Sequence, residues 1–208
     1  MPTAYQVELA KLQDAAPSLK TGVVNSIIEA EFGRPVEEVF GSFDPVPLAA
    51  ASIGQVHAAT LPDGTAVVVK VQRPDVVSQI ELDLRVLHNL ATTASRRWPV
   101  AEEYDVVGLV NEFAQTLRAE TDYIREGRNA ERFTANFSGD DSVHFPCVFW
   151  EQTTARVLTL ERLAGIKIDD LDGLDAAGVD RGRIAMNGAR MVLKMVFRDR
   201  FFHADPHP

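Results

Sequence analysis

A lysine at the end of a valine run, with a group of small residues upstream, carries the clearest chemical signal in the sequence. Lys70 follows three consecutive valines, and the upstream pattern reads Ala49-x-Ala51-x-x-Gly54-x-Val56. This is the layout of a nucleotide-cradling hairpin, Gly-x-Gly-x-x-Gly-x-Val, with alanine at the first two glycine positions. Small side chains let backbone N–H groups approach a phosphate, and a lysine on the next strand would lie nearby as a point charge. The pattern therefore predicts a nucleotide site. There are two simpler alternatives: the small residues form a tight loop that binds no ligand, and Lys70 marks the point where the strand reaches solvent.

Three carboxylates follow on a helix that we predict over residues 105–133. Asp122 and Glu126 are four residues apart and share one helix face, whereas Glu120 points elsewhere. One interpretation is a solvated acidic patch. The other is that one of these carboxylates pairs with Lys70, since a lysine near a partly buried site would otherwise tend to lose its charge. The residues alone leave both interpretations open.

The C-terminal segment His203-Ala204-Asp205-Pro206-His207-Pro208 is a second candidate site. Its prolines disfavour a helix, so the two histidines cannot share a helix face as zinc ligands do, and we predict no metal site there. The better match is a kinase catalytic loop, His-x-Asp-x-x-x-x-Asn, in which the aspartate orients the acceptor hydroxyl and the asparagine binds Mg²⁺. Asp205 takes the aspartate position, and the matching asparagine would fall at position 210, two residues past Pro208.

The elements that position these residues are helices flanking a run of short strands. Periodicity and capping residues predict a helical N-terminus that stops at Gly33, and further helices over residues 36–40, 74–91, 105–133, 168–171 and 181–201. Strands are predicted over residues 43–47, 55–61, 66–72, 147–150 and 157–161. Pro62-Asp63-Gly64 joins the second and third strands as a hairpin turn, because glycine accepts a positive φ. This order predicts an α+β fold with the sheet on one side.

Composition excludes several classes of protein. The 208 residues carry a net charge of -9, and an acidic chain is a poor match for nucleic acid, which needs a surplus of Lys and Arg. A single cysteine, Cys147, cannot form an internal disulfide, which suits a reducing cytosol. No run approaches the ~18 apolar residues of a transmembrane helix, and the N-terminus lacks a signal-peptide pattern. We therefore expect a cytoplasmic protein with no transmembrane segment.

Four segments of the sequence, taken together, are similar to one protein family. They are PLAAASIGQVHAATLPDGTAVVVKVQRPDV, EFAQTLRAETDYIREGRNAERF, TTARVLTLERLAGIKI and FFHADPHP. They resemble the UbiB/AarF atypical kinases of quinone biosynthesis, over nearly the whole chain from about Leu9 onward. The alanine-rich loop followed by Ser-Ile-Gly-Gln-Val is the most specific feature, because ordinary protein kinases have glycines there.

This resemblance implies roles for individual residues. It implies a nucleotide loop with a strand behind it, formed by Ala49, Ala50, Ala51, Ser52, Gly54 and Val56. Lys70 would contact the α- and β-phosphates, and Glu126 would be the helix glutamate that pairs with it.

The resemblance also implies residues that regulate or complete the site. Glu120 and Asp122 match the family's Glu-x-Asp motif, which restrains protein-kinase activity in relatives. Glu161 and Leu163 would bound the hinge beside the adenine. Asp205 would be the catalytic-loop aspartate.

By the same resemblance, the fold is protein-kinase-like. A helical extension over residues 1–42 would precede a small antiparallel five-stranded N-lobe with inserted helices and the hinge over residues 43–163. A partial helical C-lobe over residues 164–208 would end in the catalytic loop. The implied ligands are ATP or ADP with Mg²⁺. Quinone-pathway proteins or lipid head groups would be further partners, with peripheral contact to a membrane.

Some parts of the family pattern are not found in this sequence. The family's N-terminal Lys-x-Gly-Gln helix, its Mg²⁺-binding asparagine and its Asp-Phe-Gly segment are missing, and Gly127-Arg128 replaces a usual Ala-Ala. We expect the glycine to loosen the helix near Glu126. Because phosphoryl transfer depends on positioning and on metal ions that neutralise charge, we expect a truncated form with weak or no turnover.

Two alternative functions remain open at the level of sequence. Small-molecule phosphotransferases of the aminoglycoside or choline kinase type have a similar His-x-Asp loop, but they lack the alanine-rich run and the Glu-x-Asp helix. The other alternative is a non-catalytic, nucleotide-binding regulatory module.

Overall fold

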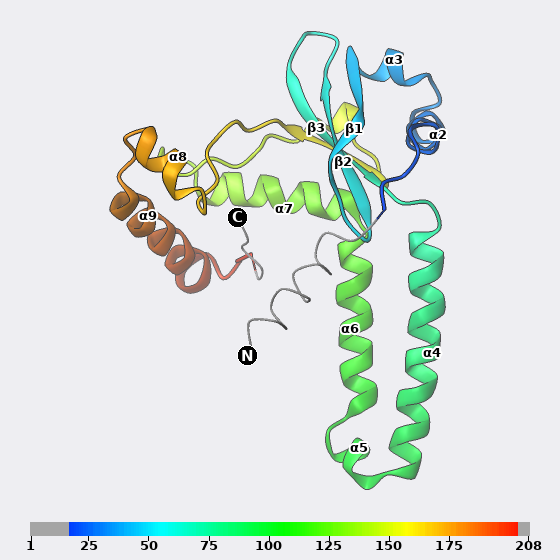
Figure 1. Cartoon of the computed structure of the whole chain (residues 1–208). Coiled ribbons are helices and arrows are strands. Elements are labelled where there is room, and N and C mark those ends of the chain that lie inside the picture. Colours follow the sequence, from blue (N-terminus) through cyan, green and yellow to red (C-terminus); the bar gives the residue numbers. More distant parts are fainter. Residues whose placement is uncertain (1–16, 204–208) are drawn as a thin grey trace. The chain divides into compact units, whose positions relative to one another are not determined.

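The computed structural model describes residues 17–203, which divide into two compact units (Figure 1). The first unit comprises residues 17–128 and 148–161, and it contains the sheet. The second comprises residues 129–147 and 162–203 and is helical. Each unit has its own hydrophobic cluster.

The sheet of the first unit has four antiparallel strands in sequence order (Figure 1). They are β1 (Ser42–Ala50), β2 (Gly54–Thr60), β3 (Ala66–Gln72) and β4 (Val157–Glu161). β1 is an edge strand, which tolerates its two prolines, and its register shifts on either side of Pro47. The predicted turn between β2 and β3 is confirmed, because Gly64 has φ +89° and Thr65 N–H donates to the Asp63 carboxylate at 2.9 Å.

The prediction of a fifth strand over residues 147–150 is wrong. Only Val148 forms a β-bridge there, with Leu160, before the chain enters the short 3₁₀ helix Trp150–Gln152. The Thr153 hydroxyl donates to the Phe149 carbonyl at 2.8 Å and accepts from Thr159 N–H at 3.1 Å. These bonds turn the chain away from β4 after one bridge, so the sheet has four strands.

Two short helices cover one face of the sheet. α2 (Thr21–Phe32) ends at Gly33, which has φ +68° as a left-handed cap, and α3 (Val36–Val39) follows. Alternate valines of β3 face these helices because side chains alternate along a strand. The resulting core contains Val24, Ile27, Ile28, Val36, Val39, Phe40, Val67, Val69, Val71 and Val157.

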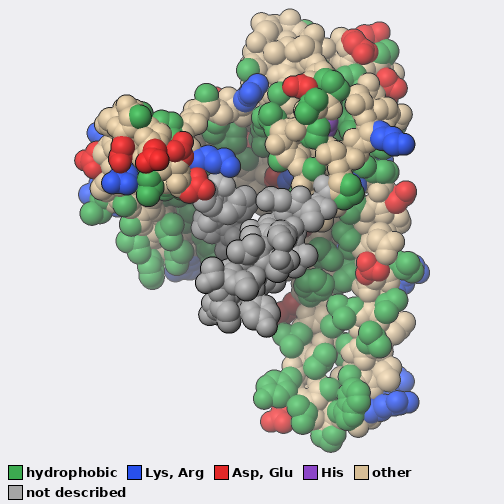
Figure 2. Space-filling model, viewed as in Figure 1, with side chains coloured by type: hydrophobic (Ala, Val, Ile, Leu, Met, Phe, Trp, Pro, Cys, Tyr) green, Lys and Arg blue, Asp and Glu red, His purple; other side chains and the backbone are tan. Residues whose placement is uncertain are grey.

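A helical hairpin is inserted between β3 and the next helix that contacts the sheet (Figure 1). It consists of α4 (Val76–Arg97), the short α5 (Pro99–Glu103) at its tip and α6 (Val106–Glu120). Hydrophobic side chains gather over its lower end in Figure 2, and Trp98, Val100 and Tyr104 are exposed there. Within residues 17–203, no helix has the length and apolarity needed to cross a bilayer.

The predicted continuous helix over residues 105–133 is instead two helices. α6 ends at Glu120, and α7 (Tyr123–Asn136) begins three residues later. The buried Gln72 amide donates to the Thr121 carbonyl at 2.8 Å, and Asp122 accepts from Arg125 N–H at 3.1 Å. A carbonyl drawn to the sheet and a side chain that caps a new first turn both favour a break at this point.

The second unit packs the end of α7 against its C-terminal helices. α8 (Leu171–Ala176) lies slightly later than predicted, and α9 (Arg181–Leu193) passes into a π-helix, Lys194–Asp199, rather than continuing to residue 201. Lys194 donates to Asp199, five residues on, at 2.6 Å and to the Asn136 carbonyl at 2.5 Å. The i to i+5 spacing of this ion pair matches the wider π turn.

A buried histidine makes the stability of the first unit depend on pH. His57 lies on the core face of β2, stacks on Phe43 at 4.9 Å between ring centroids, and has Nδ1 2.9 Å from the Asp44 carbonyl. Burial lowers the pKa of His57 below its ordinary value, so the unfolded chain binds the proton more readily than the folded one. We expect the free energy of unfolding to fall as the pH drops below about 6.5.

Urea unfolding across this pH range tests the effect. His57→Gln should flatten the dependence on pH, whereas His88→Gln, at an exposed position of α4, should leave it unchanged. Equal slopes for wild type and His57→Gln would contradict the assignment.

Candidate nucleotide-binding site

A row of four side chains crosses the sheet on the face opposite the α2–α3 core. The registers pair Ala49 with Val56, Val56 with Lys70, and Lys70 with Leu158. Directly paired residues of antiparallel strands project from the same face. Three residues that the sequence proposes for nucleotide binding are therefore neighbours on one face, with Lys70 in the middle of the sheet.

The Lys70 ammonium is held by groups from the first turn of α7. Its Nζ donates to Glu126 Oε2 at 2.7 Å and lies 4.8 Å from the ring centroid of Tyr123. The Lys70 and Glu126 side chains are 33% and 41% exposed, so the ion pair is open to solvent on one side. Lys70 is thus a fixed positive charge that a bound anion could still reach.

The alanine-rich segment is partly strand and partly turn. Ala49 and Ala50 end β1, whereas Ala51 and Ser52 lie in the turn before β2. Ala51 N–H donates to the Gly54 carbonyl at 2.8 Å, and no acceptor is found among residues 17–203 for the N–H of Ser52. Such a turn offers backbone N–H groups that small side chains do not cover.

Arg73 holds this turn in place from the end of β3. Its Nε donates to the Ala51 carbonyl and its backbone N–H to the Ile53 carbonyl, each at 2.8 Å. Its Nη2 donates to the Pro17 carbonyl, also at 2.8 Å. One arginine therefore binds two carbonyls of the turn, those of Ala51 and Ile53, and fixes its conformation.

Tyr123 fills the space beneath the start of β2. It is fully buried, and a Cβ at Gly54 would come within 2.4 Å of its hydroxyl oxygen and 2.7 Å of the Val71 carbonyl. Gly54 is therefore required by close packing. Burial, and then the charge of Glu126, raise the pKa of Tyr123, so the phenol stays protonated and does not act as a base.

The Glu-x-Asp residues lie on either side of the break between α6 and α7 rather than within one continuous helix. Glu120 is the last residue of α6 and Asp122 precedes α7; both are exposed. The Glu126 N–H donates to the Asp122 carbonyl at 3.0 Å, so these two residues are one helical turn apart, whereas Glu120 belongs to a different helix. Among the described contacts, Asp122 caps α7, which is an N-terminal role common for aspartate.

The expectation that Gly127 loosens the helix near Glu126 is wrong, because α7 continues through this glycine. It is buried within the helix, and a Cβ there would come within 2.8 Å of the Trp150 ring and 3.4 Å of Leu158. The glycine therefore lets α7 approach β4 closely, one residue after Glu126. Close packing at this point supports the position of Glu126 instead of loosening it.

The remaining predicted site residues are divided between the units or lie outside the described residues. Glu161 ends β4 in the first unit, and Leu163, half exposed, follows in the second. Asp205 lies outside residues 17–203. Within those residues, no three His, Cys, Asp or Glu side chains are grouped as metal ligands.

Sequence reasoning did not identify three residues that organise this site: Gln72, Arg73 and Tyr123. Arg73 directly follows the predicted strand, and Tyr123 lies between Asp122 and Glu126. Their positions next to predicted site residues were the signal in the sequence that could have identified them. The contacts of each residue involve chain segments that are far away in sequence. Hydrophobic periodicity gives no information about such contacts.

A small antiparallel sheet with a lysine on β3 paired to a helix glutamate defines a kinase-like N-lobe. The chain belongs to the family described as the ABC1 atypical kinase-like domain, whose sequence profile matches residues 11–208. The resemblance to UbiB/AarF proteins is thereby confirmed, as is the α+β kinase-like fold, apart from its number of strands.

Individual relatives agree with this assignment. The chain is 46% identical to the probable protein kinase UbiB of Xanthomonas euvesicatoria, over 100% of this chain and 38% of the relative. It is also 46% identical to the uncharacterized protein sll1770 of Synechocystis, over 100% of this chain and 35% of the relative. The chain thus spans little more than a third of these relatives. A solved Mycobacterium tuberculosis structure, the complex of Rv3197 with erythromycin, matches with a TM-score of 0.65 and 26% identity, over 82% of this chain and 42% of that one.

The close approach at Gly54 yields a stability prediction. Gly54→Ala should lower the free energy of unfolding by about 1–3 kcal/mol, because the Val71 carbonyl and the Tyr123 hydroxyl leave no room for a methyl group. Gly22→Ala is a matched control in α2, where nothing lies within 4 Å, and it should be neutral or stabilising by up to ~1 kcal/mol.

Urea denaturation of both variants measures these changes. The same small effect in both variants would show that Tyr123 does not restrict this strand.

Proposed function

We propose that the first unit binds the phosphates of ATP or ADP on the sheet face that carries Ala49, Val56 and Lys70. The observation that carries this proposal is the Lys70–Glu126 ion pair in the middle of that face. A lysine held this way is a preorganised charge for α- and β-phosphate oxygens. The Ser52 N–H in the adjacent turn would add a backbone donor, since the Ala51 N–H is already bonded to the Gly54 carbonyl.

The described residues fit a nucleotide better than they fit a metal ion. A phosphate needs donors, which Lys70 and the turn supply, and a close backbone approach, which the small side chains permit. Mg²⁺ needs several oxygen ligands and usually takes some of them from the phosphates. When bound, it would neutralise phosphate charge. The proposal therefore assigns Mg²⁺ no ligand among residues 17–203.

We also infer an ATP-dependent kinase or ATPase activity for the protein. This inference rests on family membership and on the UbiB relatives, which are named probable protein kinases. The same name supports a place in isoprenoid quinone metabolism. Asp205 is the proposed catalytic-loop aspartate, Glu161 and Leu163 the proposed hinge, and Glu120 with Asp122 the proposed restraint on activity.

Nucleotide binding by single-charge variants tests the proposal directly. We expect Lys70→Ala to weaken binding of a fluorescent ADP analogue roughly tenfold or more, because a charge-assisted contact to phosphate is lost. Glu126→Gln should weaken it less, since the lysine keeps its charge and loses only its orientation. Lys20→Ala, an exposed lysine just before α2, removes the same charge and should have no effect.

Fluorescence anisotropy with Mg²⁺ present measures these affinities, and circular dichroism checks that each variant is folded. Two results would overturn the proposal: no binding by the wild-type chain, or an equal loss in Lys20→Ala and Lys70→Ala.

A further inference from the structure

A polar cleft lies between α4 and α6, on the helical hairpin and separate from the nucleotide face. Its volume is about 270 Å³. Four residues of each helix line it: Leu84, Arg85, His88 and Asn89 from α4, and Val110, Asn111, Ala114 and Arg118 from α6. The proposed nucleotide function does not use any of these residues.

The cleft has an apolar floor and polar walls. Leu84, Val110 and Ala114 are buried where the two helices meet, with exposed fractions of 4%, 9% and 7%. The walls carry arginine, histidine and amide groups, and no hydrogen bond from the side chains of Arg85 and His88 is found among residues 17–203. A ligand with one anionic group and one apolar portion matches both surfaces.

Arg118 is held in a defined orientation at one end of the cleft. Its Nε and Nη2 donate to the two carboxylate oxygens of Glu81, at 2.6 and 2.8 Å. An arginine has five N–H donors, so three remain after this bidentate pair. The Arg118 hydrogen bonds, with the charges of Arg118 and Arg85, lower the pKa of Glu81. The carboxylate is therefore ionised and already engaged.

Both charged residues that line the cleft are positive. Arg85 and Arg118 contribute two positive charges and Glu81 one negative charge, on a chain whose net charge is -9. Arginines of this kind bind phosphate and carboxylate through planar, paired hydrogen bonds.

We propose that this cleft binds a phosphate monoester with a short apolar group, its phosphate held by Arg85, His88 and Arg118 and its apolar part lying on Leu84, Val110 and Ala114. The phosphate could belong to a soluble molecule or to a lipid head group, and the two sources share this chemistry.

Titrations of the isotope-labelled chain, followed by amide chemical shifts, test the site with three probes. Butyl phosphate should shift amides of residues 84–89 and 110–118 with an affinity in the millimolar range or better. Inorganic phosphate, which lacks the apolar group, should bind there more weakly. 1-Butanol, which lacks the charge, should not bind. The same shifts should persist in Lys70→Ala, which separates this cleft from the nucleotide face.

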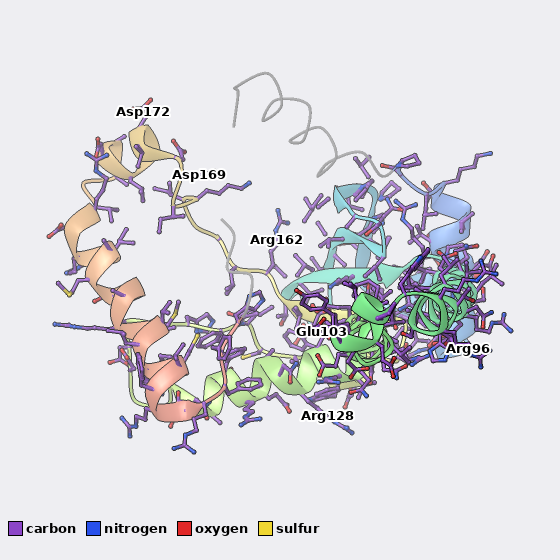
Figure 3. All side chains as sticks on the ribbon, turned by 90° about the horizontal axis from the view of Figure 1, so that it is seen from below. Arg96, Glu103, Arg128, Arg162, Asp169 and Asp172 are labelled. Carbon is purple, nitrogen blue, oxygen red and sulfur yellow. The ribbon has the colours of Figure 1, made fainter. Side chains whose placement is uncertain are left out.

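Charge variants on the hairpin provide the matched control. Arg85→Gln and Arg118→Gln should each weaken butyl phosphate binding roughly tenfold. Arg96→Gln changes an exposed arginine in the last turn of the same helix, labelled in Figure 3, and should leave the affinity unchanged. All three positions are exposed, so the variants should fold, and thermal unfolding confirms it.

Co-sedimentation with phosphatidylcholine vesicles containing phosphatidic acid distinguishes the two sources. A lipid head group predicts sedimentation that Arg85→Gln reduces and butyl phosphate competes away. A soluble ligand predicts butyl phosphate binding without sedimentation. The proposal is overturned if butyl phosphate does not bind, if shifts are spread over all arginines, or if Arg96→Gln weakens binding as much as Arg85→Gln.

Discussion

The hydrogen-bonded ion pair between Lys70 and Glu126 is the interaction on which the candidate site depends. It joins β3 to α7 across 56 residues of sequence. A pair this exposed contributes only about 0–1 kcal/mol to stability. Its importance is therefore positional: it fixes a cation at the centre of one sheet face while leaving it accessible.

Keeping Glu126 in reach of Lys70 requires several close contacts at the start of α7. Gln72 binds the Thr121 carbonyl, Tyr123 packs under Gly54, and Gly127 lets the helix lie against Leu158. Two of these contacts depend on the absence of a side chain. The glycines therefore act as spacers that set the distance between α7 and the sheet, which in turn sets the position of the Glu126 carboxylate.

Much of this arrangement could be predicted from the sequence, where local chemistry decides it. The valine run correctly predicted β3, and the Pro62-Asp63-Gly64 turn correctly predicted the hairpin that joins β2 to β3. The Lys70–Glu126 pair could be assigned only through family resemblance, because the residues alone left a solvated acidic patch equally open. The misses share one cause. The helix break at Thr121, the lost strand after Cys147 and the packing of Gly127 all depend on hydrogen bonds or ring contacts from distant segments.

In the hairpin inserted between β3 and α7, one short segment at the end of α6 connects the cleft to the nucleotide face. Arg118, which lines the cleft, lies three residues before Thr121, whose carbonyl is bound by Gln72 of β3. The last turn of α6 is therefore held at both ends, by Glu81 on the cleft side and by the sheet on the other. Tyr123 and Glu126, the groups that hold Lys70, follow within six residues of the end of α6. The last turn of α6 thus belongs to the cleft and also leads into the segment that positions Lys70.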